Sequence, residues 1–149
     1  MLSREENERL TRVGAGTPAG EMLRHYWWPI GFGQDAKRKG APVKIKLLGQ
    51  EFVLFRDGTE RLGLMALHCS HRGTSLEFGR IEEDGIRCCY HGWLYDIRGN
   101  CLEQPAEPAV STFKDRVKHP AYHAQDAGGL IFAYIGPNRR RCYRAMISW

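Results

Sequence analysis

The chain has 149 residues, five cysteines, a formal net charge of +5 and 42% hydrophobic residues. Its length suits one ordinary core and its composition excludes general disorder; the charged start, MLSREENERL, is not a secretory signal, and no apolar run approaches the about 18 residues of a membrane span. We therefore expect a cytoplasmic protein with no membrane partner, in which cysteines serve metal binding or reactivity more readily than disulfides.

Two short helices are predicted at the start of the chain. Ser3 followed by Glu6 fits the capping box of a first helix. Thr17 and Pro18 fit the N-cap and the first position of a second helix, which we expect to run through AGEMLRHYW and to end before the next proline. We assign residues 1–24 to this N-terminal helical segment.

The body of the chain has the pattern of successive antiparallel strands. VKIKLLGQEFVLFRDGTERLGLMAL contains alternating or short apolar runs, broken at Gly49-Gln50 and at Asp57-Gly58. GLIFAYIG predicts a further strand near the end. We therefore predict a mainly β domain over residues 25–137, with no linker dividing it.

The last stretch, residues 138–149 (NRRRCYRAMISW), is an atypical basic tail. It contains four arginines and no acidic residue, so the rest of the chain is nearly neutral. A nucleic-acid-binding protein would carry basic residues along the fold itself, so we expect no nucleic-acid partner. We interpret the tail as the product of a truncation or frameshift; a genuine short protein with a basic tail is the alternative.

The segment HCSHRGTSLEFGRIEEDGIRCCYHGW contains two Cys–His pairs. Cys69 and His71 form the first pair, Cys88 and His91 the second, and each lies in a Gly-flanked loop. Thiolates with imidazoles favour zinc or iron–sulfur sites over calcium or magnesium. A Cys₂His₂ zinc module is one interpretation, although zinc fingers usually present a Cys pair and then a His pair. One Cys and one His per loop instead allow two thiolates on one iron and two imidazoles on the other, the ligand division of a Rieske [2Fe–2S] centre.

These loops closely resemble those of the Rieske family, in CSHRG and CCYHGWLYD. ENERLTRVGAGTPAGEMLRHYW, PAEP and GGLIFAYIGP further resemble the N-terminal part of the oxygenase component of Rieske non-haem iron oxygenases, in the phthalate 4,5-dioxygenase-like group. The resemblance implies a Rieske [2Fe–2S] fold of antiparallel sheets, with Cys69 and Cys88 on the inner iron and His71 and His91 on the outer one. It also implies a surrounding shell of residues: Arg72, Gly73, Tyr90, Gly92, Trp93 and Tyr95.

Comparison with respiratory-chain members of the family implies how this cluster is tuned. In those relatives a Cys in each loop forms a disulfide, and a Ser and a Tyr donate hydrogen bonds to sulfur. Here Thr74 and Tyr90 stand in place of the two cysteines, Trp93 stands in place of the Ser, and Tyr95 retains the Tyr. We therefore expect no loop disulfide and a reduction potential toward the low end of the Rieske range.

The remaining Cys and His residues are not expected to bind metal. Cys89 and Cys101 are predicted to be small packing residues, and Cys142 has no evident role. His119 and His123 are four residues apart, but the proline between them disfavours a helix that would put both on one face. We therefore do not assign them to the mononuclear iron that an oxygenase needs.

Two classes of function remain. The first is the electron-transfer domain of an aromatic-ring-hydroxylating oxygenase component, an oxidoreductase, for which the resemblance implies a flavin and iron–sulfur reductase as electron donor. The mononuclear non-haem Fe(II) that activates O₂ would then lie in a full-length relative, and the resemblance implies a homotrimer. The second class is a stand-alone Rieske ferredoxin-type electron carrier without substrate chemistry. The N-terminal helices favour the first class and the chain length favours the second. We expect an oxygenase-derived domain with no catalytic residues of its own, and the sequence does not name the aromatic substrate.

Overall fold

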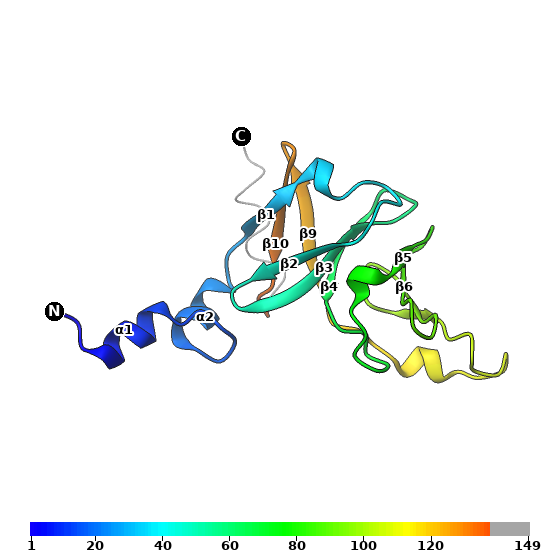
Figure 1. Ribbon diagram of the computed structural model, residues 1–149, viewed down its shortest axis with the longest axis horizontal. Coiled ribbons are helices and arrows are strands. Elements are labelled where there is room, and N and C mark those ends of the chain that lie inside the picture. The colour runs from blue at the N-terminus through cyan, green and yellow to red at the C-terminus, as the bar shows by residue number, and fades with distance from the viewer. Residues whose placement is uncertain (138–149) are drawn as a thin grey trace.

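The computed structural model describes residues 1–137, so the basic tail lies outside the described residues. Figure 1 shows two short helices at one end of the molecule, a large sheet in the middle and a smaller sheet at the other end. The strands of both sheets pair in antiparallel fashion. The prediction of a mainly β fold with two short N-terminal helices is confirmed.

The two helices begin where the sequence predicts. Helix α1 (Arg4–Thr11) is capped by Ser3, whose hydroxyl accepts a hydrogen bond from the backbone N–H of Glu6 in a complete capping box. Helix α2 (Pro18–Leu23) is capped by the Thr17 side chain. Both N-caps satisfy backbone donors that the first turn of a helix leaves unpaired.

Helix α2 ends four residues earlier than the sequence predicts. After Leu23 the backbone tightens into bonds between residues three apart, such as the one from the Tyr26 N–H to the Leu23 carbonyl. The Trp28 indole N–H donates to the same carbonyl at 2.9 Å, which caps the helix. Strand β1 (Trp28–Phe32) then pairs with the large sheet, so tertiary pairing overrides helix propensity here.

The large sheet has six strands in the order β1-β10-β9-β4-β3-β2. The strands predicted in the middle of the chain and near its end are present as β2 (Val43–Leu47), β3 (Gln50–Arg56), β4 (Leu62–Ala66) and β10 (Leu130–Tyr134). Strand β9 (Ala121–Ala127), which pairs with β4 and β10, was not predicted from the sequence. Strands β2 and β3 are joined by a two-residue turn in which Leu48 and Gly49 both have positive φ, as hairpins of this length require.

Strand β3 separates two hydrophobic cores. Phe52 and Leu54 face one core, which β10 also lines, whereas Val53 and Phe55 face the other. All four side chains are at most 1% exposed. A strand that is buried on both faces needs a continuous apolar run, which explains the sequence FVLF.

The second core connects the large sheet to the small one. The small sheet contains β5 (Arg80–Ile81), β6 (Ile86–Arg87), β7 (Leu94–Tyr95) and β8 (Cys101–Glu103) in that order. Three short 3₁₀ helices complete the described elements: η1 (Gly33–Asp35), η2 (Leu76–Phe78) and η3 (Phe113–Arg116). No helix within residues 1–137 is long and apolar enough to cross a membrane.

Candidate metal centre

The two Cys–His pairs lie in two loops at the edge of the second core. The first ligand loop, residues 69–74, follows β4 and leads into η2. A bridge between His68 and Ser75 closes its base, so the loop is the tip of a short hairpin. The second ligand loop, residues 88–93, is the tip of the hairpin formed by β6 and β7.

The backbone of the first ligand loop is closed by two hydrogen bonds. The Cys69 N–H donates to the Thr74 carbonyl at 2.9 Å, and the Gly73 N–H donates to the Cys69 carbonyl at 2.8 Å. Gly73 has a φ of +72° and no atom near the place of a Cβ. Glycine is therefore favoured there by the left-handed backbone conformation and not by lack of space.

The second ligand loop repeats this closure at the same spacing. The Cys88 N–H donates to the Trp93 carbonyl at 2.9 Å, and the Gly92 N–H donates to the Cys88 carbonyl at 3.1 Å. Gly92 has a φ of +73°, nearly the value of its counterpart in the first loop. The two loops are thus one turn design used twice, with Cys at the same position in each.

The thiols lie inside this arrangement and the imidazoles lie toward its surface. Cys69 is 3% exposed and Cys88 is 4% exposed, whereas His71 and His91 are half-buried. The two imidazole rings lie side by side, with their centroids 4.6 Å apart. Burial raises the pKa of the Cys69 thiol, and the neighbouring Cys88 raises it further. The structure therefore pairs sulfur with sulfur and nitrogen with nitrogen.

Aromatic side chains hold these groups in place. The Trp93 ring stacks on His71, with centroids 4.4 Å apart and planes 7° apart. The Tyr95 hydroxyl lies 3.2 Å from the Cys69 sulfur. Burial raises the pKa of Tyr95, so its phenol keeps its proton and can donate to that sulfur when Cys69 is a metal-bound thiolate. Tyr90 contacts the His91 ring at a centroid distance of 3.7 Å and is otherwise exposed.

The surroundings of His71 favour the neutral form of its imidazole. Burial lowers the pKa of His71, and the neighbouring His91 and the exposed Arg72 lower it further. A neutral imidazole has the free lone pair that metal binding needs. Of the six residues predicted to surround the cluster, five lie in the two ligand loops, and Tyr95 lies in β7 (Leu94–Tyr95), two residues after the second loop.

Arg87 supports the second ligand loop and was missed by sequence reasoning. Its guanidinium binds both carboxylate oxygens of Glu82, at 2.6 and 2.8 Å, and also Glu103 at 2.6 Å. A further N–H donates to the Gly92 carbonyl at 2.7 Å. The Arg87 contact lowers the pKa of Glu82 to about 2. The signal in the sequence was the pair of opposite charges on either side of the tight EDG turn.

His119 lies behind the first ligand loop and is completely buried. It precedes β9, whereas His123 lies within β9 and is exposed. The backbone is extended here, as the proline between them predicts, so the two rings do not share a helix face. Burial lowers the pKa of His119.

The other cysteines divide into a buried and an exposed one. Cys101 is 5% exposed, which confirms its predicted packing role, and burial raises the pKa of its thiol to about 11. The predicted packing role of Cys89 is wrong, because this residue is exposed. Since Cys88 points inward, its neighbour along the chain faces outward. The four cysteines in residues 1–137 are free thiols, and Cys142 lies outside the described residues.

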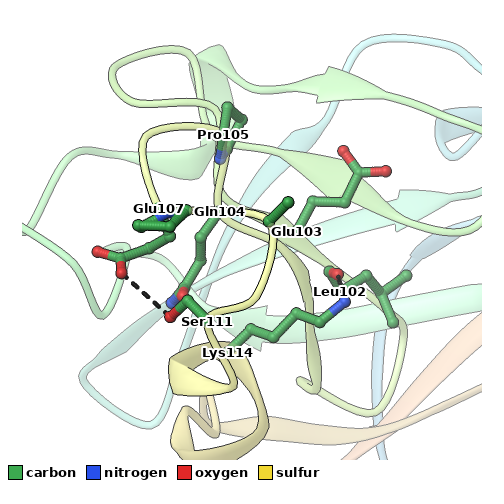
Figure 2. A pocket seen from close by; sticks show the side chains of 9 residues that line it. Leu102, Glu103, Gln104, Pro105, Glu107, Ser111 and Lys114 are labelled. Atoms are coloured by element: carbon green, nitrogen blue, oxygen red, sulfur yellow. Dashed lines mark hydrogen bonds between the residues drawn. The ribbon is translucent and has the colours of Figure 1, made fainter.

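A pocket of about 270 Å³ lies beside the second ligand loop, between β8 and η3 (Figure 2). Pro105 on its wall lies close to Gly92: a Cβ atom added to Gly92 would lie 3.1 Å from the proline ring. On this wall Ser111 donates to Glu107 at 3.2 Å, whereas the buried side-chain amide of Gln104 has no hydrogen-bond partner among the described residues. We interpret this segment as a support for the ligand loop.

Antiparallel sheets that present a thiol and an imidazole at each of two hairpin tips are typical of an iron–sulfur electron-transfer domain. The profile of the Rieske [2Fe-2S] domain matches residues 26–114. The chain belongs to this family.

Several relatives with similar sequences are oxygenase subunits. The chain is 46% identical to the 5,5'-dehydrodivanillate O-demethylase oxygenase subunit of Sphingobium sp. (strain NBRC 103272 / SYK-6), over 92% of this chain and 33% of that protein. It is 44% identical to the phthalate 4,5-dioxygenase oxygenase subunit of Pseudomonas putida, over 92% of this chain and 31% of the relative. The oxygenase of carbazole 1,9a-dioxygenase, solved in complex with ferredoxin, matches with a TM-score of 0.68 and 29% identity, over 78% of this chain and 30% of that one. The chain thus spans about a third of the length of these relatives.

The donor groups fit the family's [2Fe–2S] cluster. Such a cluster needs two protein ligands on each iron, and the structure offers two buried thiols together and two imidazoles together. Within the described part of the chain, no group of three or more His, Cys, Asp or Glu side chains is placed to hold a single metal ion. The four donors are instead grouped as two thiols and two imidazoles, which matches two ligands on each of two irons.

Proposed function

We propose that this chain is the electron-transfer domain of an aromatic-ring-hydroxylating oxygenase component of the phthalate 4,5-dioxygenase-like type. The observation that carries the proposal is the repeated ligand loop, with thiols inward and imidazoles outward. We take residues 25–137 as the Rieske [2Fe–2S] domain, with residues 1–24 as a helical segment in front of it. The similarity to oxygenase subunits over 92% of the chain supports this assignment over a separate ferredoxin-type carrier.

We assign the cluster ligands by the burial of the four donors. Cys69 and Cys88 would hold the inner iron, and His71 and His91 the outer one. When bound, the cluster supplies a reversible one-electron acceptor whose potential lies above that of an all-Cys cluster. The chain's own residues set its surroundings: burial shields the Cys69 and Cys88 sulfurs from water, and Tyr95 donates a hydrogen bond to the Cys69 sulfur.

The exposure of the histidine side determines where electrons enter and leave. His71 and His91 are the ligand residues with accessible surface, and Tyr90 beside them is 61% exposed. Electron transfer needs close approach of donor and acceptor, so a partner would dock over this face. The indole of Trp93, stacked on His71, keeps that ring in one orientation during docking.

Similarity to oxygenase subunits supports a proposal about the partners. We propose a flavin and iron–sulfur reductase as the electron donor and a mononuclear non-haem Fe(II), in the catalytic part of a full-length oxygenase, as the acceptor. Similarity to oxygenases solved with ferredoxin supports a protein electron donor. We further propose a homotrimer and a cytoplasmic location, which suits the free thiols of the described residues.

Metal analysis of the purified chain, followed by reduction, tests the proposal. We expect two irons and two acid-labile sulfides per chain, and an electron paramagnetic resonance (EPR) signal after reduction by a flavin reductase. One zinc per chain and no sulfide would refute the proposal in favour of a zinc module. Oxygenated product formed from an aromatic acid by this chain and a reductase alone, without another iron subunit, would contradict its role as an electron-transfer domain.

A further inference from the structure

His119 connects the core of the domain to the first ligand loop. Its Nε2 lies 2.9 Å from the Ala66 carbonyl at the end of β4, and its Nδ1 lies 2.7 Å from the Ser70 hydroxyl. The side chain is completely buried, and its two partners are 53 and 49 residues away in the sequence. A buried ring with both nitrogens engaged over such separations has only one orientation available.

The contacts also fix the direction of each hydrogen bond. A carbonyl oxygen only accepts, so His119 Nε2 carries a proton and donates to Ala66. In the neutral ring Nδ1 is then an acceptor, and the Ser70 hydroxyl donates to it. Ser70 itself is exposed, so water offers its hydroxyl an alternative partner, whereas the buried Nδ1 has no such alternative.

Ser70 stands between two of the residues assigned to the cluster. Cys69 precedes it and His71 follows it, so fixing the Ser70 side chain fixes the backbone between an inner and an outer ligand. The His119 ring also packs on Tyr95, with centroids 4.9 Å apart, and Tyr95 contacts the Cys69 sulfur. One buried ring thus reaches the first ligand loop by two routes.

We propose that His119 is a positioning residue for the iron–sulfur centre: it binds no metal, but it anchors the first ligand loop to the core by accepting the Ser70 hydrogen bond and supporting the Tyr95 ring. This inference rests on the proposed function, because it takes Cys69 and His71 as cluster ligands. The companion His123 is exposed on β9 and serves as a matched control.

The test uses the chain carrying its cluster, in wild-type form and as Ser70→Ala, Ser70→Thr, His119→Phe and His123→Phe. Three properties are measured: the half-life of the cluster's visible absorbance, the g values of the reduced EPR signal, and the midpoint potential. Thermal unfolding of each variant is recorded alongside. Iron and sulfide analysis of the wild type comes first, since a wild type without a cluster would overturn the proposed function itself.

We expect Ser70→Ala to lose its cluster about fivefold faster than wild type, because a buried nitrogen acceptor loses its donor. Its g values should shift, Ser70→Thr should restore both properties, and His123→Phe should match wild type. His119→Phe should shift the g values in the same way, and a variant that combines Ser70→Ala with His119→Phe should change them no more than the larger single change. If wild type carries the cluster and Ser70→Ala keeps the wild-type half-life, g values and potential, the inference is overturned. A fall in unfolding temperature alone, with unchanged g values and potential, would show ordinary core packing and would also overturn it. If His119→Phe fails to fold, the Ser70 pair decides.

Discussion

Replacing Tyr95 by Phe removes one hydroxyl from the buried side of the metal centre. Tyr95 is completely buried, and its oxygen lies 3.2 Å from the Cys69 sulfur. Phe fills nearly the same volume, so the ring can keep its contacts with Trp93 and His119. The change therefore isolates the hydrogen bond to sulfur.

The size of the effect follows from the difference between two hydrogen bonds. A bond to a neutral acceptor contributes about 1 kcal/mol and a bond to a charged one about 2 kcal/mol, so gaining an electron strengthens this bond by about 1 kcal/mol. Since about 1.4 kcal/mol corresponds to ~59 mV for one electron, the hydroxyl raises the potential by about 40 mV. Tyr95→Phe should lower the midpoint potential by this amount.

A potentiometric titration followed by EPR measures the shift. Tyr90→Phe is the matched control, because it makes the same chemical change on an exposed ring beside His91. We expect the control to stay within about 10 mV of wild type, since its hydroxyl faces water. An unchanged or higher potential in Tyr95→Phe would refute the assignment of this bond to a cluster sulfur ligand.

Three further changes test the ligand loops. Gly73→Ala should lower the free energy of unfolding by about 1–2 kcal/mol, as measured by urea unfolding, because Gly73 has a left-handed φ. The control Gly14→Ala, in equally open surroundings but without positive φ, should change it by less than about 0.5 kcal/mol. Equal effects of the two substitutions would rule out the backbone explanation. Arg87→Lys should lower the free energy of unfolding by about 1–3 kcal/mol, since a lysine cannot keep both hydrogen bonds to Glu82 and the one to the second ligand loop. An unchanged urea midpoint would count against a supporting role of Arg87. The pKa of Glu82 is lowered to about 2, so its contribution to the free energy of unfolding should be complete above about pH 4.5 and be lost as the pH falls toward 2. Glu82→Gln should flatten this dependence of the free energy of unfolding on acid pH. Parallel stability curves for the variant and wild type would contradict a stabilising role of the Glu82 carboxylate.

The parts of the fold that depend on neighbouring residues were predictable from the sequence. Ser3 and Thr17 cap helices at the expected places, because capping involves residues three apart. The turns at Gly49 and after Arg56 separate strands as the sequence indicates. The Cys–His pairs are also local, which is why their two loops can be recognised from the order of residues alone.

The parts that depend on distant contacts were not predictable in this way. The end of α2 is set by the pairing of β1 with β10, more than a hundred residues later. Burial of His119 arises from partners on β4 and the first ligand loop, so spacing alone gave only its exclusion from a helical pair. Cys89 shows the same limit at short range, because its exposure depends on which side of the loop Cys88 takes.

The most direct test of the mixed ligand set is pulsed EPR of the reduced protein with and without ¹⁵N-labelled histidine. We expect hyperfine couplings from two imidazole nitrogens, both of which change on labelling, and loss of one coupling in each of His71→Cys and His91→Cys. A reduced cluster that shows no histidine nitrogen coupling would contradict the ligand assignment and with it the proposed electron-transfer centre.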